Sequence, residues 1–108
     1  MAIKTNIFID QGTTFSYSST YLNSQGDPRD FTGITGASQM RKSYSSNTAY
    51  AFDVTLSNAG VVTLSMNAAT TSSITAGRYV YDVELTQANG AIERLVEGII
   101  TITPQVTR

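Results

Sequence analysis

The chain contains no cysteine and no histidine. Without cysteine there can be no disulfide, no thiolate nucleophile and no thiolate zinc ligand. Without histidine there is no imidazole zinc ligand and no catalytic triad that uses imidazole as its base. Such a domain is held together by packing and backbone hydrogen bonds alone, which suits a protein assembled in a reducing compartment.

Charges and long apolar runs are also scarce. Charged residues make up 14% of the 108 residues and the formal net charge is −1, so the charge balance favours neither nucleic acid nor an anionic membrane as a partner. No segment approaches the roughly 20 apolar residues of a membrane helix, and the polar opening of the chain does not resemble a secretory signal. We expect one domain, residues 1–108, made as a complete small product in the cytoplasm.

The chain instead shows a two-residue alternation of apolar and polar side chains, which is clearest between residues 77 and 85. The residues on one side of this segment are Tyr79, Tyr81, Val83 and Leu85, and those on the other are Arg78, Asp82 and Glu84. Side chains of a β-strand point alternately to opposite faces, so the segment is predicted to be a strand with one buried face.

The same alternation predicts most of the remaining structure as short strands. These strands cover residues 3–9, 14–22, 35–42, 49–57, 61–66 and 91–103. On the second of them we expect Phe15, Tyr17 and Tyr21 to share the inward face. Gly98 lies on the inward face of the last strand and predicts a bulge or a close crossing there.

Two further features complete the fold prediction. The polar segment 67–75 predicts a single helical turn capped near Asn67, because Ser and Thr are weak in helix interiors. About seven short strands, spaced roughly 8–12 residues apart, favour an antiparallel β-sandwich of immunoglobulin-like type, with a small closed barrel as the alternative. The disulfide and core tryptophan of antibody domains are absent, so the likeness is one of architecture.

No segment carries a convincing catalytic, cofactor or metal motif. Asp82 and Glu84 share one face of their strand, as a pair of glycosidase carboxylates would, but the strand tyrosines that could stack on a sugar point into the core. Asp27 and Asp30 flank Arg29 without the regular ligand spacing of a calcium loop. We therefore nominate no catalytic, cofactor-binding or metal-binding residue and expect a protein that is not an enzyme.

Charged and aromatic residues on the outside form the candidate docking set. In an immunoglobulin-like order the third, sixth and seventh strands lie side by side, so opposite charges could form a ladder across them. The members of this ladder are Arg41, Asp82, Glu84, Glu93 and Glu97. Such cross-strand pairs contribute only ~0.2–1 kcal/mol each, so the ladder serves either surface solubility or docking of a neighbouring subunit. Tyr44, in a polar loop, has the composition of a binding loop. The complete candidate docking set is Arg41, Tyr44, Asp82, Glu84, Arg94 and Arg108.

Four runs of sequence, taken in their order and spacing, resemble a family. The runs are Ile9–Phe15, Asp30–Gly33 leading into Gln39–Lys42, Ala76–Leu85 and Arg94–Arg108. Together they resemble the small structural proteins of tailed bacteriophages, in particular virion proteins of marine and cyanobacterial phages. At the level of fold the chain also resembles the amino-terminal immunoglobulin-like domain of upper baseplate proteins, without their long fibre-like extension.

The resemblance implies a non-enzymatic structural component of a tailed-phage virion, in the tail and baseplate or on the capsid surface. The implied partners are other virion proteins, namely major capsid or tail and baseplate subunits, met in multiple copies of a symmetric assembly. Neither nucleic acid nor membrane is implied. A capsid decoration protein that stabilises the head, or a host-surface or carbohydrate-binding adhesion module, is the alternative. We expect residues 3–9 or the tail beyond Thr103 to dock by adding to a neighbour's sheet edge.

Overall fold

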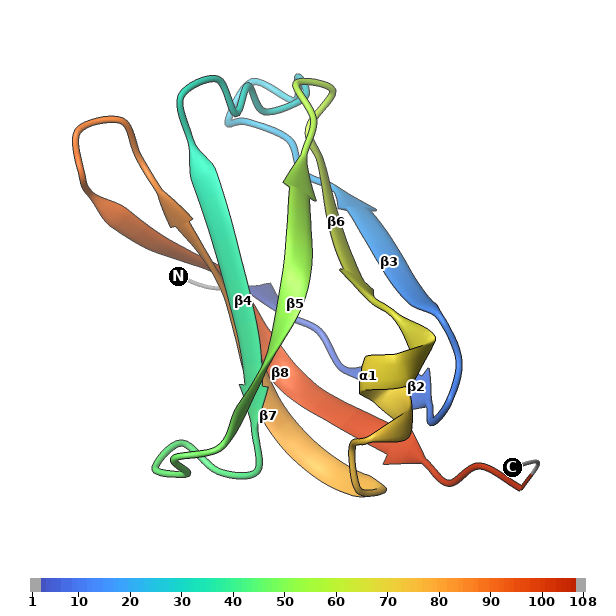
Figure 1. Cartoon of the computed structure of the whole chain (residues 1–108). Coiled ribbons are helices and arrows are strands. Elements are labelled where there is room, and N and C mark those ends of the chain that lie inside the picture. Colours follow the sequence, from blue (N-terminus) through green and yellow to red (C-terminus); the bar gives the residue numbers. More distant parts are fainter. Residues whose placement is uncertain (1–2, 107–108) are drawn as a thin grey trace.

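The computed structural model describes residues 3–106, which form eight strands and one short helix (Figure 1). The strands are β1 (Ile3–Lys4), β2 (Ile7–Asp10), β3 (Phe15–Thr20), β4 (Thr35–Arg41), β5 (Ala49–Leu56), β6 (Val61–Met66), β7 (Gly77–Thr86) and β8 (Ile92–Thr103). The helix α1 (Ala68–Ser72) lies between β6 and β7. The all-β class predicted from the alternation is confirmed.

The strands form one curled sheet in the order β1-β8-β7-β4-β5-β6-β3, with β2 also paired to β8. Strand β5 joins two layers, because residues 49–52 pair with β4 and residues 53–56 pair with β6. The expected adjacency of β4, β7 and β8 is confirmed, and the immunoglobulin-like sandwich remains a prediction that this order fits. Within residues 3–106 no backbone pairing joins β2 to β3, so the sheet does not close into the alternative barrel.

The prediction for residues 3–9 is wrong in two respects. The segment is broken at Thr5 and Asn6 into β1 and β2, and both run parallel to β8, so the sheet is mixed rather than antiparallel. Gly98 permits the break, because a Cβ at this position would overlap the Thr5 carbonyl oxygen. The same carbonyl accepts a hydrogen bond from the Tyr81 hydroxyl at 2.7 Å, and the Ile99 N–H donates to Asn6 Oδ1 at 3.1 Å. Gly98 therefore marks a close crossing, one of the two features predicted for it.

The predicted inward face of β7 is confirmed. Its buried residues are Tyr79, Tyr81, Val83 and Leu85. The Tyr79 hydroxyl donates to the Thr75 carbonyl at 2.6 Å, so the polar ends of both tyrosines are hydrogen-bonded. Burial, together with the nearby phenol of Tyr21, raises the pKa of Tyr81 well above its ordinary value of 10.0.

The helix prediction is also confirmed. Asn67 caps α1, because its Oδ1 accepts a hydrogen bond from the Thr70 N–H at 2.8 Å. Thr71 is fully buried, and its hydroxyl donates to the Thr13 carbonyl at 2.7 Å. The helix is thereby tied to the turn that leads into β3.

Strand β3 is less buried than its pattern predicts. Phe15 and Tyr21 are half-buried against the core, but the predicted burial of Tyr17 is wrong, since this residue is 36% exposed. The reason is topological: β3 ends the order of strands and, in the described part of the chain, has a neighbour on one side only.

Candidate functional site

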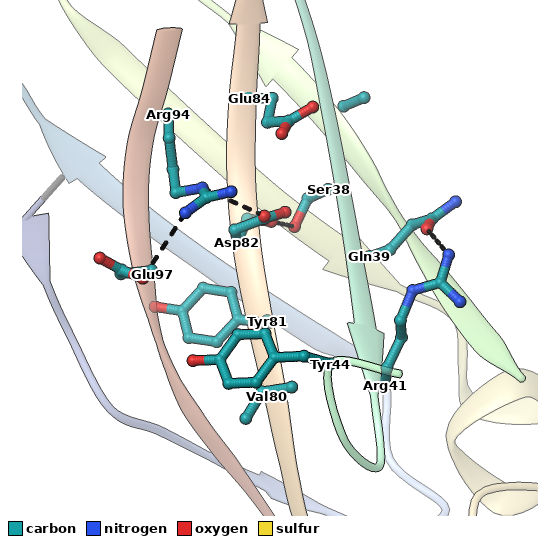
Figure 2. A pocket seen from close by; sticks show the side chains of 11 residues that line it. Ser38, Gln39, Arg41, Tyr44, Val80, Tyr81, Asp82, Glu84, Arg94 and Glu97 are labelled. Carbon is teal, nitrogen blue, oxygen red and sulfur yellow. Dashed lines mark hydrogen bonds and ion pairs between the residues drawn. The ribbon is translucent and has the colours of Figure 1, made fainter. Parts of the chain in front are cut away.

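An open groove of about 460 Å³ lies on the outer face of β4, β7 and β8, and we call it the outer groove (Figure 2). The polar and charged residues that line it include Gln39, Arg41, Tyr44, Asp82, Glu84, Arg94 and Glu97. Five of the six candidate docking residues therefore meet in one place. The sixth, Arg108, lies outside the described residues.

A β-bulge in β8 brings Arg94 into the outer groove. The pairing of β7 with β8 shifts between Val83, which faces Val96, and Glu84, which faces Arg94. Leu95 is the extra residue, and both Leu95 and Val96 are buried. Without the bulge, Arg94 would share the inward face of Val96, because side chains alternate along a regular strand.

The same bulge makes the predicted position of Glu93 wrong. Glu93 faces Leu85 rather than the outer ladder, and its carboxylate forms a two-point ion pair with the Arg29 guanidinium at 3.1 and 3.2 Å. The Arg29 guanidinium also lies 5.5 Å from the centre of the Phe31 ring. Glu93 therefore anchors the loop before β4 and has no part in the outer groove.

Arg94 is shared between two carboxylates of the outer groove. Its Nε lies 3.4 Å from Asp82 Oδ2, and its Nη1 lies 4.0 Å from Glu97 Oε1 (Figure 2). The side chains of Arg94 and Asp82 are 52% and 36% exposed, so the pair adds little to stability. Glu84 makes no ion pair with any residue between 3 and 106, which leaves its carboxylate free to meet a cation from outside.

The other side of the groove is organised by Arg41. Its Nη1 donates to the Ser46 carbonyl at 2.7 Å, and its Nη2 donates to Gln39 Oε1 at 3.0 Å. The first of these bonds holds the loop between β4 and β5, from which Tyr44 projects across the face of β7 (Figure 2). Tyr44 is 82% exposed, so most of its ring is accessible to solvent.

The hydroxyl groups beneath the groove are already occupied. Ser38 is buried and its Oγ donates to the Asp82 carbonyl at 2.6 Å, while the Tyr81 hydroxyl donates to the Thr5 carbonyl. Among residues 3–106 no group of three or more His, Cys, Asp or Glu side chains is placed to hold a metal ion. The outer groove thus combines side chains of both signs of charge with an exposed aromatic ring.

Sequence reasoning missed several lining residues, and the one on the outward face of β7 is Val80. It is an apolar side chain on the polar face of β7, out of phase with the buried tyrosines on either side of it. In the sequence, the only indication of this position was an apolar residue where the alternation of β7 calls for a polar one.

The two segments expected to dock through their backbones are partly engaged. Strands β1 and β2 already use one edge to pair with β8. At the other end of the chain, the Gln105 N–H donates to Gln11 Oε1 at 3.0 Å, and Val106 is 92% exposed. No helix in the described residues is long and apolar enough to cross a membrane.

Comparison with protein-family models gives no match, and comparison with curated proteins gives none either. Among solved structures, the chain is similar to an internalin-like protein of Listeria monocytogenes. The identity is 14% with a TM-score of 0.50, over 94% of this chain and 28% of that one. A family 123 glycoside hydrolase from Clostridium perfringens is similar at 13% identity and a TM-score of 0.45, over 98% of this chain and 24% of that one. The chain thus spans under a third of either protein, and the first likeness shows an all-β fold alone.

Proposed function

We propose that the chain is a non-enzymatic docking module that binds another protein through its outer groove. The observation that carries this proposal is the gathering of Arg41, Tyr44, Asp82, Glu84 and Arg94 around one concavity. Exposed aromatic and arginine side chains are enriched at protein interfaces. Mixed charges at the rim favour one orientation of the partner over others.

The partner that we propose is another protein of a tailed-phage particle. Support comes from the four runs of sequence that resemble small structural proteins of such phages. A small domain that binds weakly is effective in such a particle, because symmetry repeats the same contact many times. Tail or baseplate is our first location, and capsid decoration is the alternative.

Mass spectrometry of purified particles from the phage that encodes this chain tests the proposal. We expect peptides of the chain in the particles. A copy number similar to that of tail subunits supports the tail, and one similar to the major capsid protein supports decoration. Absence of the chain from the particles would contradict a virion role in either location.

The role of the groove is tested separately with a matched pair of variants. Glu84→Lys replaces the free carboxylate of the outer groove by a lysine, whereas Thr55→Lys places the same side chain on an exposed site of β5. Particles grown with Glu84→Lys should lack the protein, and those with Thr55→Lys should retain it. Equal incorporation of both folded variants would show that docking uses another surface.

A carbohydrate-binding adhesion role is the second candidate. The exposed Tyr44 ring beside the carboxylates of Asp82 and Glu84 favours it, because a ring and nearby hydrogen-bond acceptors can hold a polar ligand in a concave site. Binding of the isolated domain on a glycan array, lost on Tyr44→Ala, would favour this role over protein docking.

A further inference from the structure

The unpaired edge of β3 is the strongest unexplained feature outside the outer groove. Strand β3 pairs with β6 on one side, and in residues 3–106 its backbone makes no hydrogen bond to any other segment. A hollow of about 410 Å³ separates the first half of β3 from β2, so β2 does not cover this edge. In the upper part of Figure 1, β3 is the strand farthest to the right.

The residues whose backbone groups face this edge follow from the pairing. The Tyr21 N–H donates to the Gly60 carbonyl at 2.8 Å, on the β6 side. In an antiparallel ladder the direction of the backbone groups alternates from residue to residue. Ser16, Ser18 and Thr20 therefore each direct one N–H and one C=O towards the free edge.

Strand β3 lacks the charged residues, prolines and bulges that usually prevent the edges of two sheets from pairing. Its six residues, Phe-Ser-Tyr-Ser-Ser-Thr, include no charge and no proline, and its pairing with β6 is regular from end to end. Edges that must remain single are usually protected by lysine, proline or a bulge. At the other end of the strand order, residues 92–95 of β8 have no paired strand beyond β7 in the described part of the chain, and this stretch carries both charged residues and the bulge.

We propose that β3 pairs antiparallel with β3 of a second copy of this chain, about a twofold axis through Ser18. In this register Ser18 faces Ser18 of the second copy, and Ser16 faces its Thr20. Each of these residues then gives and accepts one backbone hydrogen bond. On the outer face the side chains that meet are hydroxyls, which already pair across this sheet, as between Ser18 Oγ and Thr63 Oγ1 at 2.8 Å.

Charge and length favour a second copy as the occupant. Two identical β3 edges meet without like-charge repulsion, because neither carries a charge. The other free edge, that of β2, is a poorer partner for β3. Strand β2 has only four residues and ends at Asp10, whose carboxylate is hydrogen-bonded to Thr103 at 2.6 Å. Pairing of β3 with β3 uses the same edge of both copies, so it gives a closed dimer with no β3 edge left for a third copy.

Cysteine cross-linking tests the register directly, since the natural chain has no cysteine. In the proposed dimer the two Ser18 Cα atoms lie about 5.5 Å apart, within disulfide range. With dissolved O₂ as the oxidant, Ser18→Cys should form a disulfide-linked dimer about tenfold faster than Thr55→Cys at ~100 μM protein, because pairing raises the effective thiol concentration towards mM. Equal rates for the two variants would overturn the proposal.

Light scattering coupled to size exclusion provides the second measurement. The unmodified chain and Thr55→Lys should be dimeric, and Ser18→Lys should be monomeric, because two lysines would meet at the axis. A monomeric unmodified chain at ~100 μM, or a series of ever larger oligomers as expected for β3 on β2, would contradict the proposed dimer. If Ser18→Lys fails to fold, the cysteine comparison alone decides.

Discussion

The two outer faces of the molecule have opposite chemical characters. The groove face, made by β4, β7 and β8, carries long charged side chains and an exposed tyrosine around a concavity. The other face, made by β5, β6 and β3, carries mainly short hydroxyls together with one carboxylate, that of Asp53, and we call it the hydroxyl face. Its hydroxyl residues are Thr55, Thr63, Ser65, Ser16, Ser18 and Thr20.

The two contacts that we propose therefore differ in their mode of recognition. Long charged side chains recognise a partner by position and sign of charge, and they keep the groove face away from a second sheet. Short uncharged side chains leave the backbone at the β3 edge accessible, so recognition there depends on strand pairing.

The largest expected effect comes from Tyr81, which supports the groove face from within. Tyr81→Ser removes a buried ring and the hydrogen bond to the Thr5 carbonyl, and should lower the free energy of unfolding by about 3–5 kcal/mol. Its outward neighbour, changed in Asp82→Ala, serves as the control and should cost under ~1 kcal/mol. Denaturant unfolding measures both, and a small loss for Tyr81→Ser would show that the register of β7 is wrong.

A smaller effect is expected at Gly98, confined to one edge of the groove face. Gly98→Ala places a Cβ against the Thr5 carbonyl and should cost about 1–3 kcal/mol by displacing β1 and β2. Amide hydrogen exchange should accelerate in β1, β2 and β8, with β3 and β6 as the internal reference. Uniform acceleration across both faces would contradict a local crossing.

Alkaline pH should weaken the domain through its buried phenols. The pKa of Tyr81 is raised in the folded state, so the unfolded chain loses this proton first as pH rises past about 10. The stability present below that pH is therefore lost progressively above it. Urea unfolding at about pH 8 and about pH 11 should show a smaller loss for Tyr81→Phe than for the unmodified chain. The raised pKa of Tyr79 leaves part of the loss in this variant.

The smallest effects are expected from surface pairs, which compare the two faces most directly. Arg94→Ala removes an exposed ion pair and should cost under ~1 kcal/mol, with the loss shrinking at high salt. Thr63→Val removes the hydroxyl pair with Ser18 and should be insensitive to salt. Thermal unfolding at low and high salt distinguishes them, and equal salt dependence would mean that charge does not differentiate the faces.

The candidate site was partly predictable from the sequence. The alternation placed Arg41, Asp82 and Glu84 outside, and a polar loop indicated that Tyr44 is exposed. The outward position of Arg94 required the bulge, whose local signal is the adjacent apolar pair Leu95 and Val96 in an otherwise alternating strand. Without knowledge of the strand pairing, this signal does not show whether the residues before Leu95 or those after it point inward at even-numbered positions. For that reason Glu93 was assigned to the wrong face.

The amino-acid sequence by itself determined the strand class and most of the inward faces, because a period of two residues is a local property of an extended chain. Tertiary structure alone decided the parallel course of β1 and β2, the bulge at Leu95 and the single neighbour that β3 has among residues 3–106. Each of these depends on which distant strand lies alongside. The whole fold decides which backbone N–H and C=O groups pair, since every residue except proline carries the same two groups.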